Sequence, residues 1–367
     1  FYRFKARKGQ VLKVSVTARR LRSPLDPMLR VLDDDGRVLA WNDDMQDTGS
    51  LTDRAGMLTH AADPELLFTA PARGTYFIQV SDTQNQGGET HAYRLSLAAP
   101  QPGFEVYITP STVTIPASAG GRATLHVRRT DGFEGPVEVS LASGSGRFSI
   151  SGGRIPAGQD SVPVVISRRA TPGSDTPLRY TNAGLRDGWK TFPVNKRGRA
   201  GGIDFAWLDL TAHATIGSEP VSRPVIPADE VTQAFITYHL VEAQGLTAFA
   251  MQGLRQQPAV RLKETGPMQF KAGDTVSLDL KAMKLPGNMS GPIFELESAP
   301  AGLAMQTSGD PGKMTLDFTA AEALEPGLEG NLVVGVYFEV SPRSKDGKRK
   351  PRKIAVGALP AIPYSTR

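Results

Sequence analysis

The sequence predicts an all-β chain made of tandem β-sandwiches. Apolar and polar residues alternate over short segments, as in strands that have one face on a core. The 38 Gly and 28 Pro residues interrupt these segments often, which favours many short elements over a few long helices. At 367 residues the chain is too long for one ordinary sandwich and suits two to four domains.

Residues 1–99 predict the first sandwich. Residues 1–20 contain two strands joined by Lys8-Gly9-Gln10, and residues 28–41 contain two more across Asp35-Gly36. Residues 65–82 predict another pair across Pro71-Ala72-Arg73-Gly74, and a strand within 91–99 closes the unit. We expect Asp35-Gly36 to form a type I′ hairpin turn.

The same region carries three motifs in order: FKARKGQ, then DPMLRVLDDDGRVLAWNDD, then FTAPARGTYFIQV. In this order and spacing they resemble the bacterial pre-peptidase C-terminal domain. The resemblance implies a β-sandwich from an exported bacterial protein, and some members of that family bind calcium. The family's opening strand would precede Phe1, so we expect the sequence to be a piece of a longer polypeptide.

Residues 103–198 predict an immunoglobulin-like sandwich. Pro100-Gln101-Pro102-Gly103 has the composition of a linker, and the strand pattern restarts at Phe104. Strands of about eight residues separated by Gly and Pro turns are typical of this fold. The phrase GFEGPVEVSL resembles the Ig-like modules that accompany pre-peptidase C-terminal domains.

Residues 203–364 predict a larger Ig-like sandwich with an insertion, after a second boundary at residues 190–202. Within it, residues 227–252 leave two alternatives open. One is a hairpin across Glu242 to Gly245, and the other is a helix begun by Pro227-Ala228-Asp229-Glu230. The stiff Phe, Ile, Thr and Tyr side chains favour the hairpin.

Several kinds of chemistry lack their sequence signatures. The chain has no cysteine, which excludes disulfides, zinc-thiolate sites and thiol nucleophiles. It has no G-x-S-x-G, no H-E-x-x-H, and no run of about 18 apolar residues that would predict a membrane-spanning helix. The histidines are scattered: His60, His91, His126, His213 and His239. We therefore expect no catalytic activity in this region.

The acidic segment 25–44 contains two features. We expect Asp33-Asp34-Asp35 to be solvated turn residues that cannot all meet one ion, because consecutive strand residues face opposite ways. The strand end is a candidate calcium site, because loop carboxylates and amide oxygens are the ligands that calcium prefers. Its candidate ligands are Asp26, Asn42, Asp43 and Asp44. The alternative is that these side chains cap their own loop backbone.

A basic run near the end of the chain is the other charged outlier. Residues 341–367 hold eight Lys or Arg against one Asp, which exceeds the net charge of +5 for the whole chain. The candidate anion-binding residues are Lys348, Arg349, Lys350, Arg352 and Lys353. No aromatic residue within 341–353 could stack on bases, so we expect a solvated loop, or a surface polymer as its anionic ligand, and no nucleic acid.

These features predict a non-catalytic structural or adhesive region of a modular exported bacterial protein, located outside the cell, on its surface or in the periplasm. It would space or present domains, or bind a protein, matrix or polymer partner. One alternative is an accessory C-terminal region of an exported hydrolase. The other is a carbohydrate-binding module, which is disfavoured because Trp41, Trp189 and Trp207 are dispersed over three regions.

Overall fold

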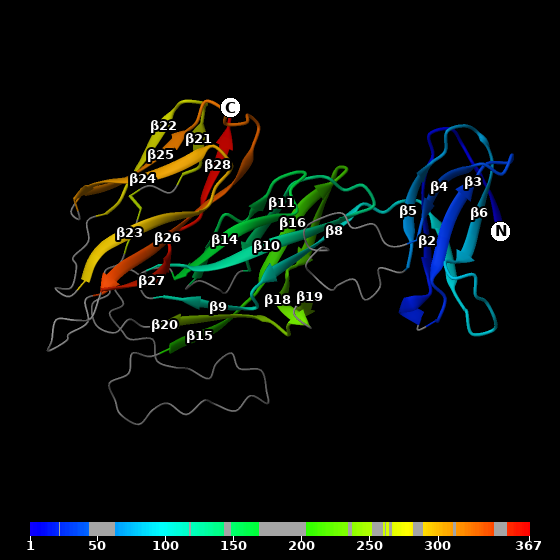
Figure 1. Ribbon diagram of the computed structural model, residues 1–367, viewed down its shortest axis with the longest axis horizontal. Helices are drawn as coiled ribbons and strands as arrows, with labels where there is room; N and C mark the ends of the chain where they lie inside the picture. The colour runs from blue at the N-terminus through cyan, green and yellow to red at the C-terminus, as the bar shows by residue number, and fades with distance from the viewer. Residues whose placement is uncertain are drawn as a thin grey trace, which may run out of the picture.

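The structure is a computed structural model, and β-strands make up its ordered elements (Figure 1). A 3-10 turn at Arg19–Leu21 interrupts them. The all-β prediction is confirmed. The structure describes residues 1–21, 23–43, 63–116, 119–142, 148–168, 203–233, 237–251, 260, 262–263, 266–281, 289–310, 313–340 and 351–367.

The first sandwich consists of two facing sheets. One has the order β1 (Tyr2–Ala6), β6 (Gly74–Asp82), β3 (Pro27–Leu32) and β4 (Val38–Asn42). The other has the order β5 (Glu65–Thr69), β2 (Val11–Thr17) and β7 (Arg94–Ala98). Alternation places Leu12, Val14 and Val16 of β2 in the core, where they meet Leu29 and Ile78 of the first sheet.

Two predicted strand pairs are wrong in the first sandwich. The strands on either side of Lys8-Gly9-Gln10, β1 and β2, belong to different sheets, and so do β5 and β6 on either side of Pro71-Ala72-Arg73-Gly74. The two connections bind each other at one end of the sandwich. Gly9 N donates to Ala70 O (2.8 Å), and Ala70 N donates to Gln10 O (2.9 Å). Each connection therefore carries the chain between sheets.

The hairpin across Asp35-Gly36 is present, but its turn is not type I′. A type I′ turn needs positive φ at both central residues, and here only Gly36 has it, at 81°. Gly36 N donates to Asp33 O and Asp33 N donates to Arg37 O, so the turn is a tight four-residue turn followed by a glycine bulge. The extra residue shifts the β3–β4 register after Val31.

The second sandwich has three sheets around one core. The largest sheet has the order β12 (Phe148–Ser151), β14 (Ser161–Arg168), β10 (Gly121–Thr130), β8 (Gly103–Thr109), β18 (Ile226–Gln233) and β19 (Thr237–Glu242). The second has β13 (Arg154–Ile155), β11 (Val137–Leu141), β16 (Leu210–Ile216) and β17 (Glu219–Pro224). The third has β15 (Ile203–Leu208), β20 (Leu246–Met251) and β9 (Thr112–Ile115).

This grouping differs from the predicted ranges 103–198 and 203–364. Strands β15 to β20, which follow the predicted boundary, share sheets with β8, β9 and β11, which precede it. Leu208, Leu246 and Ala248 pack in the same core as Val106 and Leu125. A core shared across residues 169–202 could not be seen in the local strand pattern, because pairing in a sheet is not local. The predicted boundary at residues 190–202 lies outside the described residues.

The predicted hairpin across Glu242 to Gly245 is also wrong. The described residues of 227–252 are strands and not a helix, as favoured. However, β19 pairs with β18, whereas β20 pairs with β15 and β9 in another sheet. The short connection again turns the chain between sheets.

The third sandwich comprises a five-stranded and a three-stranded sheet. The first has the order β21 (Met268–Phe270), β28 (Ile362–Thr366), β26 (Glu329–Val340) and β23 (Met289–Ser298), with β27 (Arg352–Ala358) also paired to β26. The second has β22 (Thr275–Asp279), β25 (Lys313–Ala320) and β24 (Leu303–Asp310). Phe270, Phe318 and Phe338 are fully buried between them.

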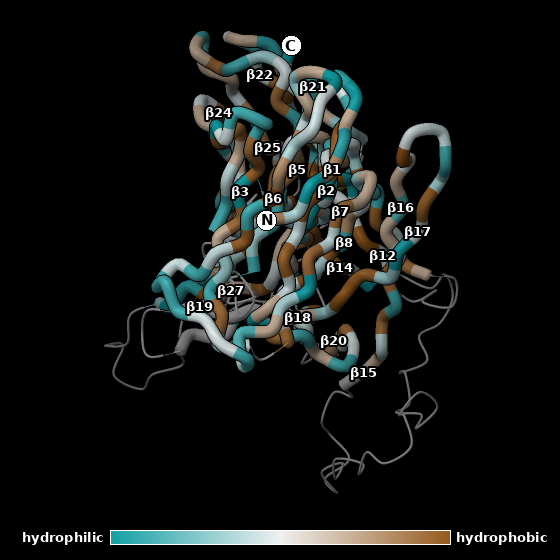
Figure 2. Tube along the Cα trace, turned by 90° about the vertical axis from the view of Figure 1, so that its right-hand side faces the viewer, coloured by the Kyte–Doolittle hydropathy of each residue, from teal (hydrophilic) through white to brown (hydrophobic). Residues whose placement is uncertain are grey.

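The three sandwiches follow one another along the long axis of the molecule (Figure 1). The tube in Figure 2 shows hydrophobic residues alternating with hydrophilic ones along many strands, as expected where each sheet has one face on a core. Within the described part of the chain, no helix is long and apolar enough to cross a membrane.

Candidate functional site

Two of the predicted calcium ligands, Asn42 and Asp26, already make side-chain hydrogen bonds within the protein. Asn42 is buried, and its Nδ2 donates to Glu65 O at 2.7 Å, which ties β4 to the opposite sheet. Asp26 Oδ2 accepts from Thr83 Oγ1 at 2.6 Å. Asp43 is half-buried at the end of β4, and Asp44 lies outside the described residues. Calcium binding there stays a prediction.

The structure does gather Asp33, Asp34 and Asp35, contrary to expectation. These residues lie in the turn and not in a strand, so their side chains do not alternate, and their carboxylate oxygens lie within 4.8 Å of one another. The protein already uses two of them. Asp33 Oδ1 accepts from the backbone N of Asp35 and Arg37, and Asp35 Oδ2 pairs with Arg37 Nη2 at 3.1 Å. The cluster therefore stabilises its own turn.

The basic run is described only in part. Lys348, Arg349 and Lys350 lie outside the described residues, and Arg352 is exposed at the start of β27. Lys353 pairs with Glu295 and its Nζ lies 4.1 Å from the centroid of the Tyr337 ring. This lysine has partners within the third sandwich, and anion binding by the whole run stays a prediction.

Two histidines lie against hydroxyl groups. His126 Nε2 is 2.9 Å from Thr109 Oγ1, while its buried Nδ1 has no partner among the described residues. Burial lowers the pKa of His126 to about 4, so the imidazole is neutral at neutral pH. His213 is exposed between Ser222 Oγ (2.8 Å) and Ser140 Oγ (3.4 Å) on an outer sheet face.

The most elaborate constellation joins the second and third sandwiches. Gly120 and Ala358 exchange two backbone hydrogen bonds, with N to O distances of 2.8 and 3.0 Å, so a β-bridge links the two units. Beside it, Val165 of the second sandwich packs against Val333, Ala358 and Ala361 of the third, and all four are buried. The joint therefore has a small apolar core of its own.

A buried asparagine clamps the same joint. Asn331 is 4% exposed, and its Nδ2 donates to Gly152 O (2.7 Å) and to Pro163 O (2.9 Å) of the second sandwich. Nearby, Ala361 N donates to Ser151 Oγ at 2.8 Å. A Cβ on Gly152 would lie 2.5 Å from Asn331 Nδ2, so only glycine leaves room for the clamp.

A charged pair closes the other side of the joint. Arg122 of β10 binds both carboxylate oxygens of Glu297 from β23, and its Nη2 also donates to Gly357 O at 3.0 Å. Tyr337 Oη donates to Glu297 Oε1 at 2.7 Å. A bidentate pair with a third partner fixes both distance and orientation.

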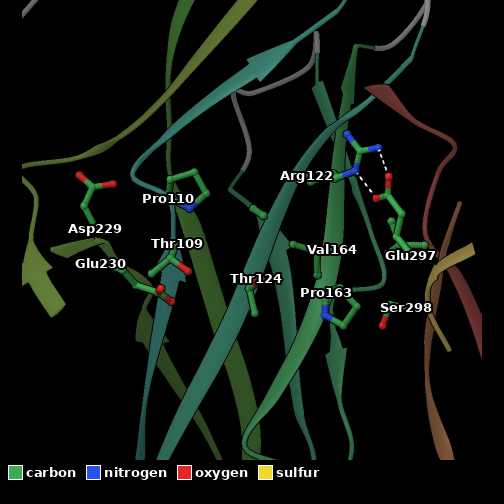
Figure 3. A pocket seen from close by; sticks show the side chains of 12 residues that line it. Thr109, Pro110, Arg122, Thr124, Pro163, Val164, Asp229, Glu230, Glu297 and Ser298 are labelled. Atoms are coloured by element: carbon green, nitrogen blue, oxygen red, sulfur yellow. Dashed lines mark hydrogen bonds and ion pairs between the residues drawn. The ribbon is translucent and has the colours of Figure 1, made fainter. Parts of the chain in front are cut away.

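A cleft of about 470 Å³ lies along this joint. Thr109, Thr124 and Glu230 line its side on the second sandwich, and Glu297 and Ser298 line the other side (Figure 3). The figure shows Arg122 and Glu297 paired at its edge.

The first sandwich meets the second through a smaller contact. Lys13 Nζ of β2 lies 2.6 Å from Asp131 Oδ1 of the second sandwich and 2.8 Å from Glu65 Oε1 of its own. Burial opposes the charge of Lys13, but hydrogen bonds to Asp131 and Glu65 raise its pKa overall. The linker joins in, because Gln101 N donates to Asp131 Oδ2 at 2.9 Å.

Comparison with known families bears on the first sandwich. Residues 1–82 match the family model of the bacterial pre-peptidase C-terminal domain. The match ends at the last residue of β6 and covers less than a quarter of the 367 residues. It confirms the resemblance carried by the three motifs, and the strand β7 of this pre-peptidase C-terminal-like sandwich lies beyond the matched range.

Curated proteins and solved structures add little. A search of curated proteins found no match. A protein of unknown function from Porphyromonas gingivalis is 12% identical, with 70% of this chain and 99% of that chain covered and a TM-score of 0.21. The Escherichia coli adhesin FdeC is 11% identical, with 96% of this chain and 94% of that chain covered and a TM-score of 0.21. An I-band fragment of titin is 9% identical, with 99% of this chain and 97% of that chain covered and a TM-score of 0.17. TM-scores this low carry no function to this chain.

Sequence reasoning missed the joint entirely. Arg122, Asn331 and Glu297 belong to ordinary strand patterns, and their partners across the joint lie 168 to 235 residues away along the chain. The local signals were an asparagine among the apolar residues of β26 and two glycines that leave room for the joint. A Cβ on Gly152 would collide with Asn331, and a Cβ on Gly335 would collide with Glu297. A polar residue within a buried run is a sign of a specific hydrogen bond.

Proposed function

We propose that this chain is a non-catalytic structural and adhesive region of a modular exported bacterial protein. The second and third sandwiches act as one stiff spacer, and the spacer presents the pre-peptidase C-terminal-like sandwich to a partner. The partner is a protein, a matrix or a polymer at the cell surface.

The observation that carries this proposal is the contrast between the two joints. The joint between the second and third sandwiches combines a β-bridge, an apolar core, a buried asparagine and a bidentate ion pair. The joint at the first sandwich rests on Lys13, Asp131 and the short linker. Buried polar clamps fix geometry, whereas a joint held by one partly buried ion pair and a short linker has fewer contacts to fix its orientation.

The export part of the proposal is tested by labelling intact cells. The chain has no cysteine, so Gln306→Cys introduces a single thiol on the exposed edge strand β24. If the protein is at the cell surface, we expect a membrane-impermeant maleimide to label this variant on whole cells. If the protein is periplasmic, we expect labelling once the outer membrane alone is opened. The parent chain is the matched control. Labelling that begins only after the cytoplasm is released would contradict export.

One second candidate is favoured by the family match. The matched family is named for the C-terminal domain of bacterial pre-peptidases. The chain would then be an accessory region of an exported peptidase or other hydrolase. The complete reading frame tests this directly: a hydrolase domain on the same polypeptide would support it, and a frame of sandwiches alone would contradict it.

We also propose calcium as a ligand of the strand end at Asp26, Asn42, Asp43 and Asp44. The support is chemical, since Asp43 follows β4 in a loop rich in oxygen ligands. Asp26 Oδ2 accepts one hydrogen bond from Thr83 Oγ1, and a carboxylate has further lone pairs that can coordinate an ion.

A further inference from the structure

The outward face of the sheet β1-β6-β3-β4 differs from the other face of the same sheet. The inward residues Leu29, Val31 and Ile78 are almost fully buried in the core of the first sandwich. Because side chains alternate along a strand, the residues between them point outward. The register places Trp41 opposite Arg30, and Arg30 opposite Gln79, in one row across three strands.

The centre of this outward face is apolar and its edge is aromatic. Trp41 on the edge strand β4 is 60% exposed, and Leu39 on the same strand is 40% exposed. Phe77 stands in the next row, paired with Leu32 on one side and Arg3 on the other. None of these four apolar side chains belongs to the core cluster of the sandwich, and of the four only Leu32 is buried. An exposed indole next to apolar neighbours offers a flat stacking surface.

The charged residues at the outward strand positions of this face all have one sign, whereas acids lie in the β3–β4 turn, at Asp33 to Asp35, and after β4, at Asp43. Its outward strand residues include Arg3, Lys5 and Arg30, and no outward position of β1, β3, β4 or β6 carries an acid. In the part of the chain that the structure describes, none of these three cations has an ion-pair partner. Arg30 Nη1 makes only a long contact to Gln79 Oε1, at 3.5 Å. The face is therefore complementary to an anion.

The position of the face suits contact with a large ligand. The other sheet of the sandwich is turned toward the second sandwich, because Lys13 of β2 reaches Asp131. In Figure 1, β3 and β6 accordingly lie on the far side of the first sandwich, away from β8. The outward face is the end face of the described structure, and neither of the other sandwiches covers it.

We propose that this face binds an acidic polysaccharide, with one sugar ring stacked on Trp41 and the carboxylate or sulfate groups paired with Arg30, Arg3 and Lys5. The inference rests on the proposed adhesive function and names the chemistry of its partner. A polysaccharide fits better than an acidic protein segment, because the indole lies in one row with the guanidinium of Arg30 and, beyond it, the amide of Gln79, which can bind ring hydroxyls. Cations on β1 and β3, with β6 between them, also suit a long repeating polyanion.

The test is affinity electrophoresis of the full chain in gels containing sodium alginate, a polyuronate, with dextran as the neutral comparison. We expect alginate to retard the chain and dextran to leave it unaffected. Trp41→Ala and Arg30→Gln should each weaken binding by about tenfold or more, as removal of a central anchor does. Arg223→Gln removes one exposed cation from β17 of the second sandwich and should leave binding unchanged.

Three results would overturn the proposal: no retardation by alginate, full retention of binding in Trp41→Ala, or equal binding of poly-glutamate, which has the charge but no ring. Far-ultraviolet circular dichroism of each variant excludes unfolding as the cause of lost binding. The alginate test and the test of the proposed function can fail separately. If the maleimide labels Gln306→Cys on whole cells but the chain does not bind alginate, the exported spacer is kept and only the proposed ligand is removed.

Discussion

At the scale of single residues, Asn331 is the side chain on which the joint depends most. Its amide satisfies two carbonyl groups of the second sandwich from a buried position. Asn331→Ala leaves both carbonyls without this donor, so we expect a loss of about 1–3 kcal/mol in the free energy of unfolding. Urea denaturation measures this loss, and Gln306→Ala, on the exposed strand β24, should stay within about 0.5 kcal/mol. Equal effects of the two would contradict the clamp.

His126 gives the fold a dependence on pH. Its pKa of about 4 in the folded state lies below the ordinary histidine value, because burial disfavours the charged imidazole. Above about pH 6.5 the residue is neutral in both states and costs nothing. As the pH falls from about 6.5 toward 4, the unfolded chain binds a proton that the folded chain does not, so stability is lost on the order of 2–3 kcal/mol.

The measurement is urea unfolding at pH 7, 5.5 and 4.5, followed for the chain and for His126→Gln. Glutamine does not titrate, so the variant should lose less stability than the parent over this window. Other groups titrate equally in both proteins. Parallel losses in the two proteins would show that His126 does not contribute.

The calcium proposal also belongs to this scale. Binding to the folded chain alone raises its melting temperature by mass action. We therefore expect the chain to melt at a higher temperature in millimolar calcium than in chelator, and Asp43→Asn to reduce the difference. Identical melting curves in calcium and in chelator would remove the site.

At the scale of elements, Gly36 sets the β3–β4 hairpin. Its φ of 81° is strained for any residue with a Cβ, although no atom lies within 4 Å of the place where a Cβ would stand. Gly36→Ala should therefore cost about 1 kcal/mol through backbone strain alone. Gly87→Ala is the control, since Gly87 has equally open surroundings and no positive φ. Thermal melts that cannot distinguish the two variants would contradict this reading of the turn.

The hairpin also shows how far sequence reasoning reaches. Alternation in VLKVSVT and MLRVL was sufficient to locate β2 and β3, because each strand has one face on a core. The partner of each strand was predicted only where a tight turn joins neighbours. The connections at Gly9 and before Gly74 instead lead to the other sheet. They bind each other through Ala70, which is about 60 residues from Gly9 in the sequence, so the local turn residues do not reveal this arrangement.

At the scale of the whole molecule, the same limit explains the misplaced boundary. Residues 103–168 look complete as a row of strands, but Ile115 and Val139 are buried against strands that return only after residue 203. The candidate calcium and anion sites rest on composition, which sequence shows well. The joint rests on Arg122 and Asn331 meeting partners more than 150 residues away, which a single sequence does not show.

The joint between the first and second sandwiches should be more mobile than the joint between the second and third. Lys13→Met keeps the length of the side chain and removes the charge that reaches Asp131. We expect wider motion of the first sandwich relative to the second, seen in small-angle scattering as a larger maximum dimension of the molecule. Lys263→Met, which removes an exposed pair with Asp279, is the control. Unchanged scattering in Lys13→Met would show that the linker alone sets this joint.

The stiffness of the joint between the second and third sandwiches is the central claim, and spin-label distances test it most directly. Because the chain has no cysteine, Ser140→Cys on β11 and Gln306→Cys on β24 give one label on each side. We predict a single narrow distance distribution, which broadens when Arg122→Ala and Asn331→Ala are added. A broad distribution in the protein without these two changes would contradict the spacer.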